Sequence, residues 1–141
     1  MKRFFDTTVL VAAVLEEHQH HLPSFRAFAA ATRTNAFCAA HSVAEMYAIL
    51  TRMPGKQRLS SDQALLALSA VEARLTVVPL DASEYFAAIR KCASIGIAGG
   101  TIYDGLIASC ALKSKADVIY TWNVAHFLLL GSEVAQKVRT P

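Results

Sequence analysis

Four short, continuously apolar segments recur along this chain, and a stretch with helical spacing follows each of them. Continuous apolar runs of this length are typical of strands that are covered on both faces, and strands that alternate with helices form parallel sheets. The alternation predicts a three-layer α/β/α sandwich with a central, mainly parallel sheet of four to five strands. The predicted strands begin at Phe4-Phe5 and continue with Asn35–Ala39, Leu75–Leu80 and Val118–Thr121, while Val134–Val138 is either a helix or an edge strand.

The segments between the strands have apolar residues at helical spacing. With 141 residues and no repeat, low-complexity tract or linker, the chain is expected to form a single domain over residues 1–141. The helix that starts at Thr101 is apolar nearly all round, so deep burial is expected. The predicted helices are Thr7–Glu17, Pro23–Thr32, Ser42–Met53, Ser60–Arg74, one from Asp81, Thr101–Lys115 and Ala125–Leu129.

Composition argues against disorder, because 54% of the residues are hydrophobic and 18% are charged. This apolar content suggests that some surface is buried between chains, as in a homodimer. The net charge of +3 is compatible with a polyanionic partner.

Cysteine usage and hydropathy bear on the compartment. Three widely spaced cysteines fit no disulfide framework or zinc pair, which favours a reducing cytoplasm. The basic start and apolar run resemble a signal peptide, but Asp6 interrupts the run. No apolar run reaches 18 residues, so no membrane span is expected.

Three acidic residues lie where a parallel sheet places its sites, near the carboxyl ends of strands. Asp6 ends the first strand, Glu45 lies in the first turn of the helix after the second, and Asp104 lies in the first turn of the helix before the fourth. Three carboxylates brought together repel one another, and a divalent cation relieves that repulsion. Mg²⁺ or Mn²⁺ suits such oxygen ligands and would support hydrolysis of a phosphate ester.

Helix capping is the alternative reading of the same residues. Ser42-x-x-Glu45 has the form of a capping box, Thr101-x-x-Asp104 nearly has it, and Asp6 is placed to cap the first helix. Since Ser60-x-x-Gln63 and Asp81-x-x-Glu84 show the same pattern, spacing alone does not separate the two groups. If all are caps, the chain is a non-catalytic RNA- or protein-binding module. A receiver-like phosphoacceptor domain fits less well, because the expected acidic pair and late lysine are absent.

The chain resembles the PIN domain over nearly its whole length, and most closely the VapC-type ribonuclease toxins of bacterial toxin–antitoxin pairs. The resemblance implies a sheet with the first strand in the middle, and a third strand near an edge that leaves Asp81 and Glu84 outside the acidic cluster. It also implies a Mg²⁺- or Mn²⁺-dependent endoribonuclease that acts on RNA and is inhibited by a cognate antitoxin. The segments that carry it are Phe5–Leu10, Ala44-Glu45, Tyr103–Ala108 and Tyr120–Asn123 through Phe127.

The resemblance assigns metal ligation to Asp6, Glu45 and Asp104. Asn123 takes a position where PIN domains often carry Asp, so it offers a carbonyl or orients a water but brings no charge. Three formal negative charges weaken the case for a tightly held second metal ion.

Hydroxyl, basic and histidine residues complete the candidates. Thr7 and Thr121 are placed to bond a carboxylate, a water or a phosphate, or else to serve as a helix cap and a strand end. The loop residues Arg52, Lys56 and Arg58 are either RNA-backbone contacts or a solvated basic loop. Zinc binding by His18, His20 and His21 is not favoured by their spacing, and His126 is interpreted as a surface residue near the site.

Overall fold

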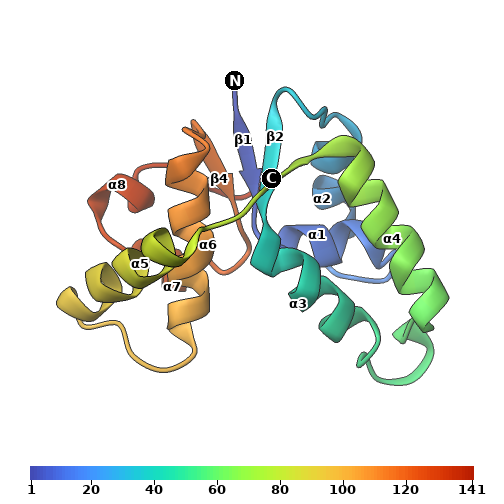
Figure 1. Ribbon diagram of the computed structural model, residues 1–141. Coiled ribbons are helices and arrows are strands. Elements are labelled where there is room, and N and C mark those ends of the chain that lie inside the picture. Colours follow the sequence, from blue (N-terminus) through green and yellow to red (C-terminus); the bar gives the residue numbers. More distant parts are fainter.

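A computed structural model describes all 141 residues as a parallel sheet between two layers of helices (Figure 1). The strand order is β3-β2-β1-β4-β5, and every neighbouring pair is parallel. This confirms the predicted α/β/α fold, with β1 in the middle and β3 at an edge. The strands are β1 (Arg3–Phe5), β2 (Ala36–Ala39), β3 (Thr76–Val78), β4 (Val118–Tyr120) and β5 (Val138–Arg139).

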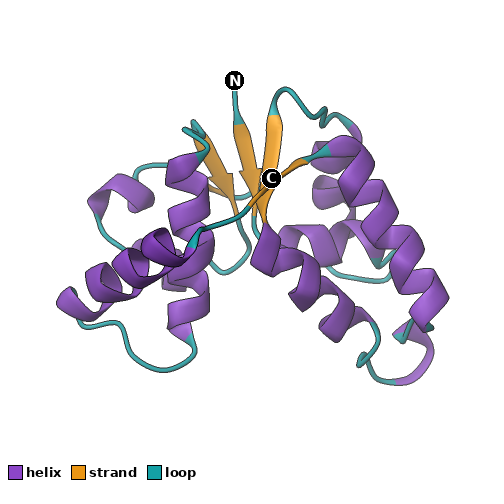
Figure 2. Ribbon diagram, viewed as in Figure 1, coloured by secondary structure: helices purple, strands orange, loops and turns teal.

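The helices divide between the two sides of the sheet, with α1 to α4 on one side and α5 to α8 on the other (Figures 1 and 2). Their bounds are α1 (Thr7–Val14), α2 (His21–Ala29), α3 (Ala40–Leu50), α4 (Ser61–Arg74), α5 (Ala82–Ser94), α6 (Thr101–Lys113), α7 (Val124–Leu128) and α8 (Ser132–Ala135), and a short 3₁₀ helix, η1 (Gly55–Gln57), joins α3 to α4.

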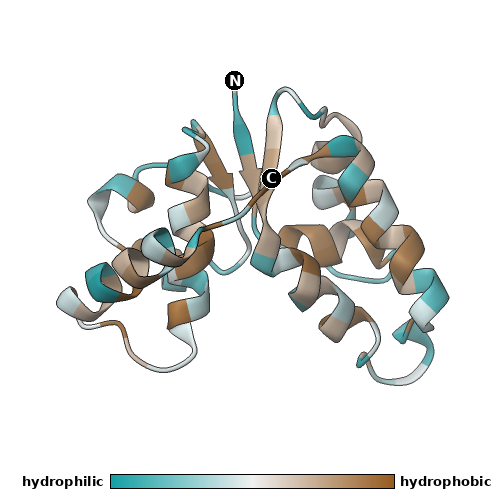
Figure 3. Ribbon diagram, in the orientation of Figure 1, coloured by the Kyte–Doolittle hydropathy of each residue, from teal (hydrophilic) through white to brown (hydrophobic).

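The central strand supplies one large side chain to each side of the sheet, because successive strand residues point to opposite faces. Phe4 packs in the apolar cluster that includes Ile107 of α6 and Phe127 of α7. Phe5 packs in the other cluster, with Leu10 of α1 among its neighbours. In Figure 3, the ribbons of β4 and α1 have mostly the brown colour of hydrophobic residues. Covering both faces explains why the strand residues are continuously apolar.

Three predictions about element boundaries need correction. Helix α3 begins at Ala40, directly after β2, so Ser42 is its third residue and Glu45 lies in its second turn. The segment Val134–Val138 contains the end of α8 and the start of β5, so both of its alternatives occur in part. Helix α6 is buried mainly between Gly105 and Ala111, but its first turn extends beyond the carboxyl edge of the sheet and is not buried.

The state of the cysteines and the character of the helices can be read directly from the structure. All three cysteines are free and buried, in keeping with the absence of a disulfide framework. None of the helices combines the length and the apolar character that crossing a bilayer requires.

Candidate active site

Asp6 stands at the carboxyl end of the central strand and is only 1% exposed. Its backbone N–H donates to the carbonyl of Tyr120 at 2.9 Å, which continues the pairing of β1 with β4. Its Oδ2 accepts hydrogen bonds from the hydroxyls of Thr8 and Thr121, both at 2.7 Å. Its Oδ1 is buried without any partner. One carboxylate oxygen is therefore held in place, while the other is left to bind something else.

Burial governs the charge of Asp6. The pKa of its carboxyl is raised from 3.8 to about 6, mainly by desolvation and also by the nearby charge of Asp104, while hydrogen bonds from the hydroxyls of Thr121 and Thr8 oppose the rise. A buried anion with one unpartnered oxygen is costly unless a cation meets it. This oxygen therefore fits a hard divalent ion, for which carboxylates are preferred ligands.

Asp104 is in the first turn of α6 and belongs to a small polar network. Its Oδ2 accepts from Nδ2 of Asn123 at 3.1 Å and lies 3.0 Å from Nδ1 of His126. The same His126 nitrogen is 2.8 Å from Asn123 Nδ2, so it accepts from Asn123 or donates to Asp104 according to its tautomer. Desolvation raises the pKa of Asp104, and the hydrogen bond from His126 opposes that rise.

Glu45 faces the site from the second turn of α3. Its Oε1 accepts from the hydroxyl of Thr7 at 2.7 Å, and Thr7 Oγ1 is also 2.8 Å from the buried hydroxyl of Ser42. Its Oε2 is 3.6 Å from Nε2 of His41. The His41 ring in turn stacks on Tyr103 of α6, with centroids 5.3 Å apart. Glu45 is thus linked to both α1 and α6.

The capping interpretation is wrong for these three acids. Asp6 precedes α1, but its side chain accepts no capping hydrogen bond there. The residues that precede α3 and α6 are Ala39 and Gly100, which have no side-chain oxygen, so neither Glu45 nor Asp104 belongs to a capping box. The other two sequence patterns are genuine capping boxes, in which Ser60 pairs with Gln63, and Asp81 with Glu84. The structure thus separates two groups of acids that spacing could not distinguish.

The three carboxylates influence one another electrostatically without forming a ready coordination shell. Asp104 raises the pKa of Asp6, and Glu45 raises that of Asp104. No three His, Cys, Asp or Glu side chains lie within common reach of one ion as they stand. The fit to a divalent cation rests on the oxygen donors and the unpartnered Asp6 Oδ1. Coordination of one ion by all three acids would require their carboxylates to lie closer together than they do here.

The remaining predicted residues divide into those near the acids and those away from them. The hydroxyls of Thr7 and Thr121 donate to carboxylates, and Asn123 contributes its amide nitrogen to Asp104. The basic residues Arg52, Lys56 and Arg58 are exposed and follow the far end of α3, and Arg58 Nε donates to the carbonyl of Met53 at 2.9 Å. From Glu45 to Arg52 is ~10 Å along the helix axis and its extension, so these cations stand apart from the acidic cluster.

Sequence reasoning missed several neighbours of the carboxylates. Thr8, Ser42 and His41 were not selected, although His41 precedes Glu45 by the four positions that put two residues on one helix face. His126 is 49% exposed in its side chain, as expected of a surface residue, yet it contacts Asp104 directly. No local pattern identifies Ser42, because its partner Thr7 lies on α1, whereas Thr8 lies only two residues after Asp6 and was overlooked.

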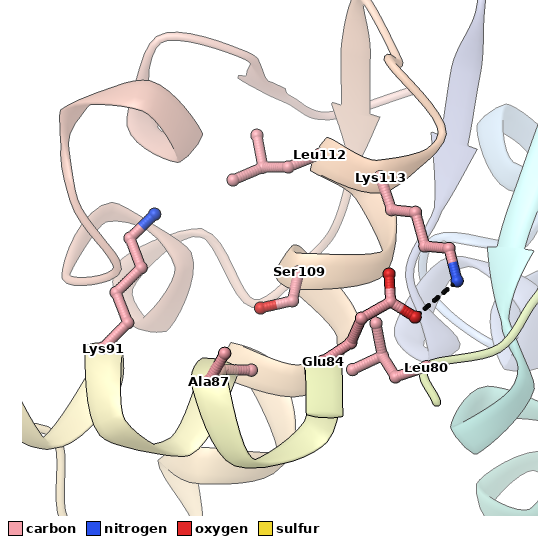
Figure 4. A pocket seen from close by; sticks show the side chains of 8 residues that line it. Leu80, Glu84, Ala87, Lys91, Ser109, Leu112 and Lys113 are labelled. Atoms are coloured by element: carbon pink, nitrogen blue, oxygen red, sulfur yellow. Dashed lines mark hydrogen bonds and ion pairs between the residues drawn. The ribbon is translucent and has the colours of Figure 1, made fainter. Parts of the chain in front are cut away.

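A separate hollow of about 260 Å³ lies between α5 and α6 (Figure 4). At its edge, Lys113 Nζ and Glu84 Oε1 form an ion pair at 2.7 Å. None of Asp6, Glu45 and Asp104 lines this hollow. Glu84 therefore lies outside the acidic cluster, and so does Asp81, which caps α5 beside it.

The chain is similar in sequence to proteins of known family. The family model of the PIN domain matches residues 3–124. The chain is 30% identical to Ribonuclease VapC27 of Mycobacterium tuberculosis over 113 residues, which cover 80% of this chain and 79% of that protein. It is 31% identical to Ribonuclease VapC40 of the same species over 117 residues, 81% of each.

Solved structures agree in fold. The crystal structure of Mycobacterium tuberculosis VapC20, a Sarcin-Ricin loop cleaving toxin, superposes with a TM-score of 0.71 at 16% identity, covering 86% of this chain and 90% of that one. The crystal structure of VapBC2 from Rickettsia felis, bound to a DNA fragment from its promoter, superposes with a TM-score of 0.64 at 16% identity. The match covers 99% of this chain and 98% of that chain. With the family match and the identities to two VapC ribonucleases, the chain belongs to the PIN-domain family, in its VapC group.

Proposed function

We propose that this chain is an endoribonuclease that hydrolyses RNA phosphodiester bonds with the help of Mg²⁺ or Mn²⁺, as the toxin of a toxin–antitoxin pair. Membership of the VapC ribonucleases supports the reaction class, and PIN-domain ribonucleases generally depend on divalent metal. The single observation that carries the proposal within this chain is the buried Asp6 carboxylate, whose Oδ1 has no partner at the carboxyl edge of the sheet.

In this proposal, Asp6, Glu45 and Asp104 hold the ion through carboxylate oxygens. A divalent ion bound there would polarise the phosphodiester and lower the pKa of a water. Thr8 and Thr121 hold Oδ2 of Asp6 and leave Oδ1 available to bind the ion, and Thr7 orients Glu45. Asn123 positions Asp104 through its amide and brings no fourth charge, which favours one ion over two. If Asp104 turned toward the ion, the amide of Asn123 would be free to contact a water or a phosphate.

Charge and exposed apolar surface support the proposed partners. Arg52, Lys56 and Arg58 form an exposed basic stretch suited to an RNA backbone. Leu66 on α4 and Phe86 on α5 are 72% and 63% exposed, and such side chains favour contact with an antitoxin or a second copy in a homodimer. An antitoxin arginine would complement the acidic cluster.

Three free thiols suit a cytoplasmic setting, with residues 1–141 acting as one domain.

The test is cleavage of RNA by the purified chain, with cleavage sites mapped by sequencing RNA ends. Asp6→Asn and Asp104→Asn are expected to lower the rate by at least about 100-fold, because each removes a negative charge that would hold the divalent ion, and the ion would stabilise the charge of the transition state. Asp81→Asn is the matched control, since Asn also caps helices and Asp81 lies outside the cluster. Full activity of metal-exchanged Asp104→Asn would refute the assignment. A folded wild-type chain without cleavage in Mg²⁺ or Mn²⁺ would favour a non-catalytic binding module.

A further inference from the structure

A cavity of about 340 Å³ adjoins the acidic cluster and has an aromatic wall. Trp122 and His20 both line it, and their rings are stacked with centroids 3.7 Å apart and planes within 7° of parallel. Such a pair presents flat π surface, which suits a third planar ring. A cavity of this size falls within the usual range for small-ligand sites.

The wall is held by hydrogen bonds at both ends of Trp122. The indole Nε1 donates to the fully buried hydroxyl of Ser24 at 2.8 Å, and the backbone N–H donates to Thr8 Oγ1 at 3.0 Å. The ring therefore has a fixed orientation before any ligand arrives, which lowers the entropic cost of binding.

Polar groups surround this aromatic wall. Nδ1 of His18 accepts from the backbone N–H of His20 at 3.0 Å, so a neutral His18 ring carries its proton on Nε2 and has a donor to offer. Burial and the neighbouring His20 lower the pKa of His18, which favours that neutral form. Gln19 also lines the cavity and offers both a donor and an acceptor. Stacking surface with mixed donors and acceptors is the chemistry that recognises an unstacked nucleobase.

The cavity also lies next to two of the proposed catalytic carboxylates. Two of its lining residues contact them, because Thr8 donates to Asp6 and Asn123 donates to Asp104. We propose that this cavity binds a nucleobase of the RNA substrate, stacked on the His20–Trp122 pair, from a nucleotide next to the cleaved phosphate. The inference deepens the proposed function and rests on it for the identity of the substrate.

The single tryptophan of the chain makes base binding directly observable. In EDTA, the Asp104→Asn variant is titrated with each of the four ribonucleoside 5′-monophosphates and with ribose 5-phosphate, and the fluorescence of Trp122 is followed. Saturable quenching is expected with at least one nucleotide and not with ribose 5-phosphate. Equal quenching by ribose 5-phosphate, or none by any nucleotide, would overturn the inference.

Two variants at position 20 separate stacking from a structural role. In the same background, His20→Ala is expected to weaken nucleotide binding by roughly 5- to 150-fold, the usual effect of losing one stacked ring. His20→Phe keeps a ring against Trp122 and should retain most of the affinity. Thermal unfolding verifies that both variants fold. If His20→Ala binds as well as its parent, or if His20→Phe is as weak as His20→Ala, base stacking on this pair is wrong.

This assay stays separable from the test of catalysis, because it requires no cleavage and no metal. If Asp104→Asn cleaves RNA as fast as the wild type, the proposed function is refuted. The nucleotide titration then decides by itself whether the pocket binds a base. Conversely, metal-dependent cleavage without quenching by nucleotides would refute only the pocket.

Discussion

The hydroxyl of Thr121 donates to Oδ2 of Asp6 at 2.7 Å across 115 positions of sequence. Both residues are buried, and the parallel pairing of β1 with β4 brings them side by side. Together with Thr8, this bond occupies one oxygen of Asp6 and leaves the other unpartnered. Burial of this carboxylate, which the two hydrogen bonds offset only in part, keeps its pKa raised.

The raised pKa of Asp6 predicts that the metal-free protein loses stability as the pH rises. The folded state binds the proton more tightly than the unfolded chain, with a pKa of about 6 against 3.8. Between these values the native state holds more protons, so the free energy of unfolding falls as pH rises through this window. Across this window the free energy of unfolding falls by a total on the order of 3 kcal/mol. Asp104, whose pKa is also raised, adds to the loss in the same direction.

Urea unfolding in EDTA from pH 4 to 7.5 measures this dependence. Asp6→Asn should flatten the pH profile, because Asn does not titrate, and the residual slope then reports Asp104 and other groups. Superimposable slopes for the wild type and Asp6→Asn would show that Asp6 has an ordinary pKa.

Metal binding should stabilise the protein through the same carboxylates. Mn²⁺ at about 100 times its Kd would add about 2.7 kcal/mol, which corresponds to a rise in Tm of about 10 °C for a chain of this size. Asp104→Asn should lose most of this rise. Asp81→Asn removes one negative charge from a genuine cap and should retain it. An equal loss in both variants would point to non-specific charge neutralisation.

Removal of the basic side chains after α3 should weaken RNA binding in a salt-dependent way. Each phosphate contact contributes about 0.7 to the slope of log K against log salt concentration for single strands. Replacing Arg52, Lys56 and Arg58 by Ala should therefore reduce the slope by up to about 2, measured by filter binding with the Asp104→Asn background. Arg33→Ala is the control, because Arg33 is exposed before β2, at the opposite edge of the sheet. An unchanged slope in the triple variant would identify a solvated loop.

Gly105 should not tolerate the substitution that stabilises most helices. Gly→Ala usually gains about 1 kcal/mol in a helix interior, but a Cβ at position 105 would lie 2.5 Å from Sγ of Cys92. The resulting overpacking should cost about 1–3 kcal/mol. Adding Cys92→Ala removes the clashing sulfur and should recover part of the loss. Unfolding free energies of the two single variants and the double variant measure this coupling, and strictly additive effects would exclude the clash.

Local chemistry explains which parts of the fold the sequence predicted well. The apolar runs of β1, β2 and β4 indicated strands because residues buried on both faces must all be apolar. The boxes at Ser60 and Asp81 were recognised because both partners of a capping box lie within one turn. The same motif failed at Ser42, where α3 had already begun two residues earlier and the hydroxyl lies against Thr7 instead.

The sequence by itself determined the alternation of strands and helices, and with it the placement of Asp6, Glu45 and Asp104 near one edge of a parallel sheet. Only the tertiary structure decided what each carboxylate contacts: Thr121 and Thr8 for Asp6, Thr7 for Glu45, Asn123 and His126 for Asp104. It also decided that Asp6 Oδ1 is left without a partner and that His20 stacks on Trp122. The physical reason is that most of these contacts join residues from different elements, so they depend on strand order and helix packing, which no local pattern of residues encodes.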